Sequence, residues 1–68
     1  MEEFYRLLKG RLDEAKRREE IAKEALDFAE EAGIDVSTQR VDYESAKSDL
    51  ERIRQAYKKR TEGKGKEG

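Results

Sequence analysis

The chain has 68 residues, enough for one small domain, and contains no cysteine, histidine, proline or tryptophan. Apolar residues make up 34% of the chain and charged residues 49%, which leaves little material for a core. This composition excludes a disulfide framework, a thiolate metal site and chemistry that depends on cysteine or histidine. Because no apolar run exceeds two residues, we expect no membrane span and a soluble, cytoplasmic protein.

Charge is segregated along the chain, although the formal net charge is only −1. Residues 1–18 and 52–68 together carry thirteen basic and six acidic side chains, whereas residues 19–51 carry three basic and eleven acidic ones. If the chain folds back once, the two basic segments meet at one end of the molecule and the acidic segment forms the other. Segregation of this kind bears on association rather than on the fold.

Residues 2–32 predict a long first helix. They include one glycine, Gly10, and are rich in strong helix formers. Their apolar side chains recur at alternating steps of three and four residues, which is helical spacing. Gly33 followed by Ile34 is typical of a Schellman ending, in which a left-handed glycine terminates the helix. Gly10 indicates either a kink or a close approach of another helix, and the sequence leaves both open.

Residues 33–37 predict a turn short enough to make the flanking helices antiparallel neighbours. Ser37 is the preferred N-cap of the second helix, with Asp35 as the alternative. Residues 38–61 repeat apolar side chains in a coiled-coil pattern and predict that second helix. Residues 62–68 place three glycines among charges and predict a disordered charged tail. The predicted fold class is therefore all-α, with residues 1–61 forming a coiled-coil-like antiparallel two-helix hairpin.

The two repeats define one seam along which the helices are expected to pack. The predicted intrahairpin seam consists of Leu12, Ala15, Ala22, Leu26, Ala29, Tyr43, Ala46, Leu50, Ile53 and Tyr57. Few of these side chains are large, and the ordering of each residue costs roughly 1–2 kcal/mol of backbone entropy. An isolated pair of such helices is therefore not expected to be stable.

The first helix also carries a second apolar stripe, displaced by roughly 100° from the seam. One neighbouring helix covers only one seam, and the longer first helix is expected to overhang the second at its N-terminal end. We therefore expect two hairpins to pair antiparallel as a four-helix bundle, with each acidic turn against the partner's basic open end. The candidate oligomer interface consists of Phe4, Tyr5, Leu8, Ile21, Ala25, Phe28 and Ala32.

No catalytic residue, cofactor site or metal site is predicted. The serines and threonines have no histidine to activate them, and the carboxylates along one face of the first helix are interpreted as a solvated surface. We therefore predict a small non-catalytic protein that acts through homo-oligomerisation and protein–protein interaction, with itself or another protein as partner. The high content of Glu, Lys and Arg also resembles that of thermophilic proteins.

The alternative function is a regulator that binds DNA or RNA through the basic open end. Cations gathered at that end can neutralise phosphates of a nucleic acid. The residues predicted to make such contacts are Arg11, Arg17, Arg18, Arg54, Lys58, Lys59 and Arg60.

Overall fold

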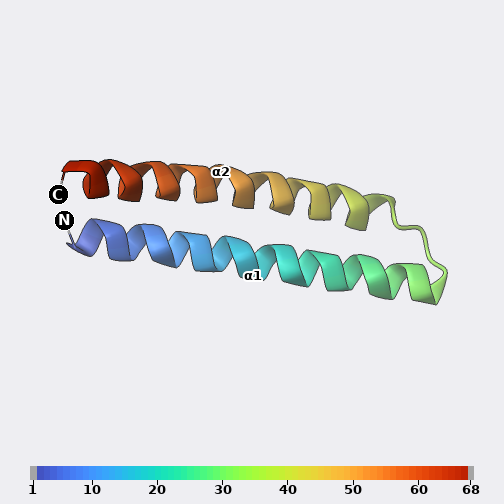
Figure 1. The fold of residues 1–68 in the computed structure, drawn as a ribbon. Coiled ribbons are helices and arrows are strands. Elements are labelled where there is room, and N and C mark those ends of the chain that lie inside the picture. The colour runs from blue at the N-terminus through green and yellow to red at the C-terminus, as the bar shows by residue number, and fades with distance from the viewer. Residues whose placement is uncertain (1, 68) are drawn as a thin grey trace.

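The computed structural model describes the backbone of residues 2–67 and the side chains of residues 2–62. Within this range the chain forms two α-helices, α1 (Glu2–Ala32) and α2 (Ser37–Glu67), and no strand. The helices run antiparallel and pack against each other (Figure 1). The predicted all-α hairpin is therefore confirmed.

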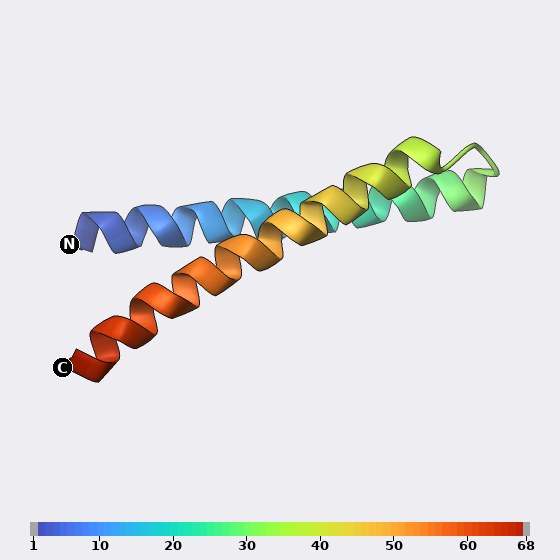
Figure 2. The same ribbon diagram turned by 90° about the horizontal axis from the view of Figure 1, so that it is seen from above.

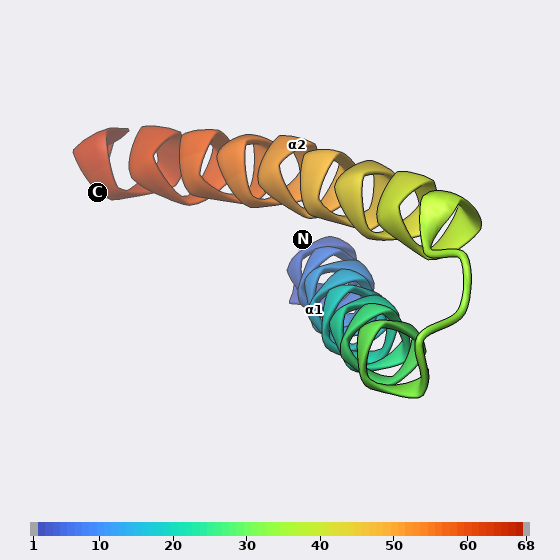
Figure 3. The same cartoon turned by 90° about the vertical axis from the view of Figure 1, so that its right-hand side faces the viewer.

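The molecule is a single layer of two helices, with extents of 53 × 16 × 13 Å. The helices cross, so that they lie together near the turn and diverge toward the two termini (Figure 2). The view from the turn end shows the same crossing, with the axis of α2 inclined to the axis of α1 (Figure 3). Because only one layer is present, each helix has one covered side and leaves the rest of its surface open.

Gly33 ends α1 in the way that the sequence predicts. Its φ of 72° lies in the left-handed region, where a glycine meets no steric penalty. The Gly33 N–H donates to the carbonyl of Glu30 at 3.2 Å, and the Ile34 N–H donates to the carbonyl of Ala29 at 3.1 Å. These two hydrogen bonds are the pair that defines a Schellman motif, so this prediction is confirmed.

The start of α2 is capped by Asp35 rather than by Ser37. Asp35 Oδ1 accepts hydrogen bonds from the Ser37 hydroxyl at 2.7 Å and from the Ser37 N–H at 3.0 Å. The Val36 carbonyl accepts the N–H of Arg40 at 2.8 Å, so Ser37 already lies inside the first turn. The preferred N-cap was therefore wrong by two residues. The Ser37 hydroxyl, followed by the Ser37 N–H, holds the pKa of the Asp35 carboxyl below its ordinary value of 3.8.

The C-terminal end of α2 also differs from the prediction. The sequence predicts that the helix ends near residue 61 and that residues 62–68 form a disordered tail, but the helix continues through Glu67. Residue 68 lies outside the described residues. Thr61 Oγ1 donates to the carbonyls of Tyr57 and Lys58, both at 3.1 Å, and Lys58 Nζ lies 4.0 Å from a carboxylate oxygen of Glu62. The glycines beyond lower helix propensity by about 1 kcal/mol each, but without a proline nothing blocks the helix.

The expected overhang of α1 beyond α2 is wrong, because a residue within the predicted bounds of the second helix already reaches Phe4. The guanidinium carbon of Arg60 lies 5.6 Å from the centre of the Phe4 ring, and α2 extends beyond that contact. A Cβ added to Gly10 would meet no atom within 4 Å, so the contacts in the hairpin do not require a glycine there.

The core is thin. Among the described residues only Ala15, Ala29, Ala46 and Leu50 are buried, and no charged or polar residue is. Three of these four side chains are single methyl groups, which let the helix backbones approach closely. Leu50 is thus the one large side chain that the described part of the hairpin buries.

Candidate protein-interaction surface

The structure brings the ten residues of the expected seam together between α1 and α2. Four of them are the buried residues Ala15, Ala29, Ala46 and Leu50. The other six are half-buried: Leu12, Ala22, Leu26, Tyr43, Ile53 and Tyr57. Lys47 lies over the Tyr43 ring, with its Nζ 5.4 Å from the ring centre, which covers part of this aromatic residue.

Two ion pairs between the helices lie on opposite sides of this seam. Arg18 donates to Asp49 at 2.7 Å on one side, and Arg40 lies 3.9 Å from Glu30 on the other. At 100° per residue, Arg18 and Glu30 lie on either side of the α1 seam. Exposed pairs of this kind are worth about 0–1 kcal/mol each, so they fix the register of the helices more than they stabilise them.

On the Arg18 side, α1 exposes a stripe of apolar side chains. Ile21 is 59% exposed and Phe28 is 68% exposed, and Ala25 and Ala32 beside them are exposed as well. Leu7 is 59% exposed and precedes Ile21 and Phe28 by fourteen and twenty-one residues, which puts it on the same side of the helix. These five residues form what we call the α1 stripe.

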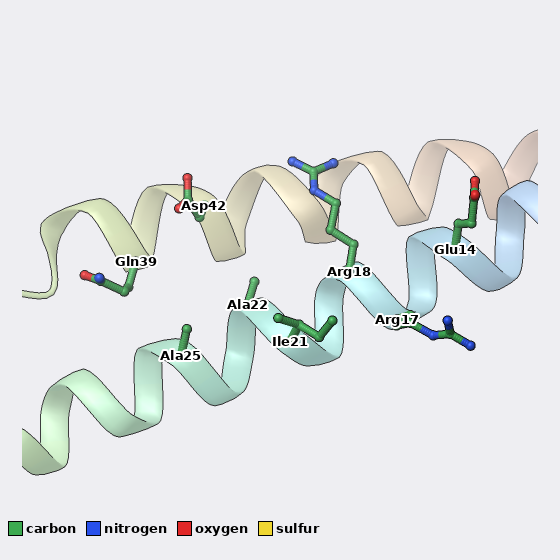
Figure 4. Close-up of a pocket in the computed structure, with 8 residues that line it drawn as sticks. All are labelled: Glu14, Arg17, Arg18, Ile21, Ala22, Ala25, Gln39 and Asp42. Atoms are coloured by element: carbon green, nitrogen blue, oxygen red, sulfur yellow. The ribbon is translucent and has the colours of Figure 1, made fainter.

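The α1 stripe borders an open groove of about 580 Å³ between the helices, shown in Figure 4. Ala22 and Ala25 point toward α2, Arg18 reaches across to it and Arg17 points away. Gln39 lines the groove from α2, and its Oε1 is buried without a hydrogen bond among the described residues. The groove is lined by Glu14, Arg17, Arg18, Ile21, Ala22, Ala25, Gln39 and Asp42.

A second hollow, of about 300 Å³, continues along the same side of the hairpin toward the termini. Arg11, Glu14 and Arg18 line it from α1, and Asp49 and Arg52 line it from α2. Arg18 borders both hollows, so they lie on one surface. We call this side, with the α1 stripe on one helix and Asp42, Asp49 and Arg52 on the other, the groove face.

The residues of the expected oligomer interface do not all lie on this face. Ile21, Ala25, Phe28 and Ala32 are exposed there, and Phe4 is exposed at the N-terminal end of α1. Tyr5 and Leu8 are instead half-buried at seam positions, in the part of α1 where Arg60 of α2 lies over Phe4. Leu7 was not among the predicted interface residues. Its spacing of fourteen and twenty-one residues from Ile21 and Phe28 could have predicted that it lies on the same side of α1.

Most of the basic residues predicted to contact nucleic acid have a partner within the hairpin. Arg18 binds Asp49, and Arg60 lies over Phe4. Three others pair along their own helix: Arg11 with Glu14 at 3.7 Å, Arg54 with Glu51 at 3.8 Å and Lys58 with Glu62 at 4.0 Å. Within the described part of the chain, Arg17 and Lys59 are the two of the seven without such a partner.

The described residues, with side chains for 2–62, also bear on metal binding and on membrane insertion. No three aspartate or glutamate side chains in this range converge in a way that could hold a metal ion. Neither helix has, over its described length, an apolar stretch that could cross a membrane. Comparison with protein families, with curated proteins and with solved structures finds no match to this chain.

Proposed function

We propose that this protein is a non-catalytic helical hairpin that acts by associating with itself through the groove face. The observation that carries the proposal is the exposure of Ile21 and Phe28 on the same side of α1, about two turns apart, at 59% and 68%. Full burial of one such side chain is worth about 1.5–3 kcal/mol. Among its described residues, the hairpin buries only one large side chain, a leucine. Covering Ile21 and Phe28 would therefore add a large share to the free energy that apolar burial supplies.

The surface arrangement supports a contact on one side only. The groove face combines the α1 stripe with two hollows. The opposite flank carries the Arg40–Glu30 pair and a hollow of about 860 Å³, whose lining is polar or charged except for Leu50. A contiguous exposed apolar patch rimmed by polar residues is typical of a protein–protein interface. The nucleic-acid alternative has weaker support, because five of its seven candidate cations already lie against partners in the hairpin.

Sedimentation equilibrium tests the proposal directly. The wild-type chain at micromolar concentration is expected to have about twice the protomer mass of 7.9 kDa. Phe28→Glu puts a charge into the apolar contact and should give a protomer mass, because an unpaired charge is costly to bury. Val41→Glu is the matched control, since Val41 is 67% exposed on α2 at a position turned away from α1.

Two results would contradict self-association through this face. A wild-type chain that sediments as a protomer across the micromolar range would remove the basis of the proposal. A dimer that survives Phe28→Glu but dissociates on Val41→Glu would place the interface on the outer side of α2 instead.

A further inference from the structure

We infer that the groove face is self-complementary, so that its occupant is a second copy of the chain, packed antiparallel about a two-fold axis perpendicular to the helices. The axis passes at the level of Arg18 and Asp49. This inference rests on the proposed self-association and adds the orientation and register of the partner. It follows from the pattern of side chains on α1, from a separate pattern on α2, and from the contact that joins them.

The first pattern is the distribution of apolar residues along α1. Phe28 and Ala32 lie near the turn, Phe4 and Leu7 lie near the N-terminus, and Arg11, Glu14 and Arg18 separate the two groups. If α1 packs antiparallel on its copy, Leu7 lies opposite Phe28 when the axis crosses between residues 17 and 18, and Phe4 lies opposite Ala32 when it crosses half a residue further on. Each of the two apolar groups then covers the other, as a two-fold interface requires. Ile21 lies opposite Glu14, whose carboxylate keeps its ion pair with Arg11.

The second pattern is the distribution of charge along the same side of α2. Asp42 and Asp49 are followed by Arg52 and by Lys59, which lies seven residues after Arg52 and therefore on the same side of the helix. An antiparallel copy of α2 places Asp42 opposite Lys59 and Asp49 opposite Arg52 when the axis crosses between residues 50 and 51. Asp42, Arg52 and Lys59 have no ion pair among the described residues of the hairpin, so they are free to form these contacts.

One contact shows that the two patterns share an axis. The centre derived from α1 lies between residues 17 and 18, and the centre derived from α2 lies between residues 50 and 51. The Arg18–Asp49 pair, at 2.7 Å, places these two levels side by side in the hairpin. A single perpendicular two-fold axis therefore matches apolar ends on α1 and opposite charges on α2 at the same time.

A parallel dimer does not give this match. With the two-fold axis along the helices, α1 of each copy would pack on α2 of the other, because both hairpins would point in the same direction. Ile21 and Phe28 would then lie against the side of α2 that carries Asp42, and that carboxylate would lose water without gaining a cation.

Cysteine cross-linking tests the register, because the chain has no native cysteine. An oxidised mixture of Leu7→Cys and Phe28→Cys chains should yield a covalent heterodimer, since the two positions face each other in the antiparallel register and a disulfide needs Cα atoms within about 7 Å. Each variant alone should give no covalent dimer, because its two cysteines would lie about 31 Å apart along the axis. A Phe28→Cys chain that cross-links to itself would overturn the antiparallel register.

Charge reversal tests the α2 contacts in a chain that keeps its whole apolar stripe. Asp42→Lys and Lys59→Asp should each weaken the dimer about 10-fold or more at low salt, because each turns two attractions into two repulsions. The variant that combines both changes should recover the wild-type dissociation constant, since every pair is again of opposite sign. Glu44→Lys, on the outer side of α2, is the control and should have little effect.

The outcomes separate the inference from the proposed function. If the wild-type chain is monomeric, the proposed self-association itself fails. Two results would leave self-association standing but show that the antiparallel register is wrong. One is a dimeric wild type whose Asp42→Lys, Lys59→Asp double variant has a higher dimer dissociation constant than either single variant. The other is a dimeric wild type whose mixed cysteine chains do not cross-link.

Discussion

Leu50→Ala is the substitution that measures how much of the hairpin's stability resides in its own seam. Leu50 is 9% exposed, and the other three buried side chains of the described hairpin are alanines, which cannot expand to replace it. The substitution removes three carbon atoms, and each buried methylene-sized group is worth about 0.8 kcal/mol. The transfer loss is therefore about 2 kcal/mol. A cavity adds to it, although the open sides of a single-layer hairpin allow partial collapse, so we expect a total of about 2–3 kcal/mol.

Thermal denaturation followed by circular dichroism at the helical minimum provides the measurement. For a domain of this size, 1 kcal/mol shifts the melting temperature by about 4–8 °C, so Leu50→Ala should lower it by about 10–20 °C. The protomer concentration must be held constant between variants, because association contributes to the apparent stability. Val41→Ala is the control: Val41 is 67% exposed, and alanine is the better helix former, so its melting temperature should stay the same or rise slightly.

The reasoning would be refuted by a Leu50→Ala chain that melts within about 3 °C of the wild type, which corresponds to less than about 1 kcal/mol. Such a result would mean that the seam contributes little and that the assembled state holds the helices together. If Phe28→Glu then lowered the melting temperature by more than Leu50→Ala, the larger part of the stability would lie between copies of the chain.

Three further predictions concern single features of the hairpin. Gln39→Leu should raise the free energy of unfolding by about 1 kcal/mol in denaturant titrations, because it replaces a buried oxygen that has no hydrogen-bond donor among the described residues. Asp35→Asn should be less stable than the wild type above pH 3.8, and the difference should shrink as the pH falls through the lowered pKa of Asp35, because the stabilising hydrogen bonds favour the ionised carboxylate that is lost there. Gel-shift titrations with duplex DNA and RNA at about 50 mM salt should show no complex, and reversal of Lys58, Lys59 and Arg60 to Glu should change nothing; a complex whose salt dependence falls in that variant would favour the nucleic-acid alternative.

The periodicity of apolar residues was sufficient to predict the two helices, and the short turn between them to predict their antiparallel arrangement. Each seam position follows from three- and four-residue steps, and Gly33 marks the end of α1 because only a left-handed residue satisfies the last carbonyls in this way. These features are local, so the order of residues carries them directly. The N-terminal cap of α2 was harder to predict, since the side chains of Asp35 and Ser37 are both capable of accepting a capping hydrogen bond and the choice depends on the path of the turn. In the structure Asp35 accepts, and the hydroxyl and N–H of Ser37 donate to it.

The end of α2 could not be predicted from propensity alone. Glycine lowers helix propensity gradually, whereas a residue such as proline stops a helix outright, and this sequence has only glycines after residue 61. The register of the two helices also changed the expected interface. Arg60 of α2 lies over Phe4, so Tyr5 and Leu8 at the same end of α1 are half-buried rather than uncovered. Leu7, on another side of α1, is exposed.

The two helices contribute different kinds of residues to the candidate site, apolar ones from α1 and charged ones from α2. This difference explains why the sequence predicted only part of the site. The stripe on α1 stands out because Ile21 and Phe28 are large and apolar, but Asp42 and Lys59 on α2 resemble any other surface charges in the sequence. Their part in the candidate site follows only from the hairpin, which places Asp42 in the groove beside that stripe. In the proposed dimer, apolar burial on α1 would supply most of the affinity, and the positions of its apolar groups fit the antiparallel register. The order of acids and bases on α2 would supply a second and independent constraint on direction, because an antiparallel copy pairs opposite signs along its length. A chain with so small a core would then depend on its exposed charges, together with the apolar stripe, to specify one assembly.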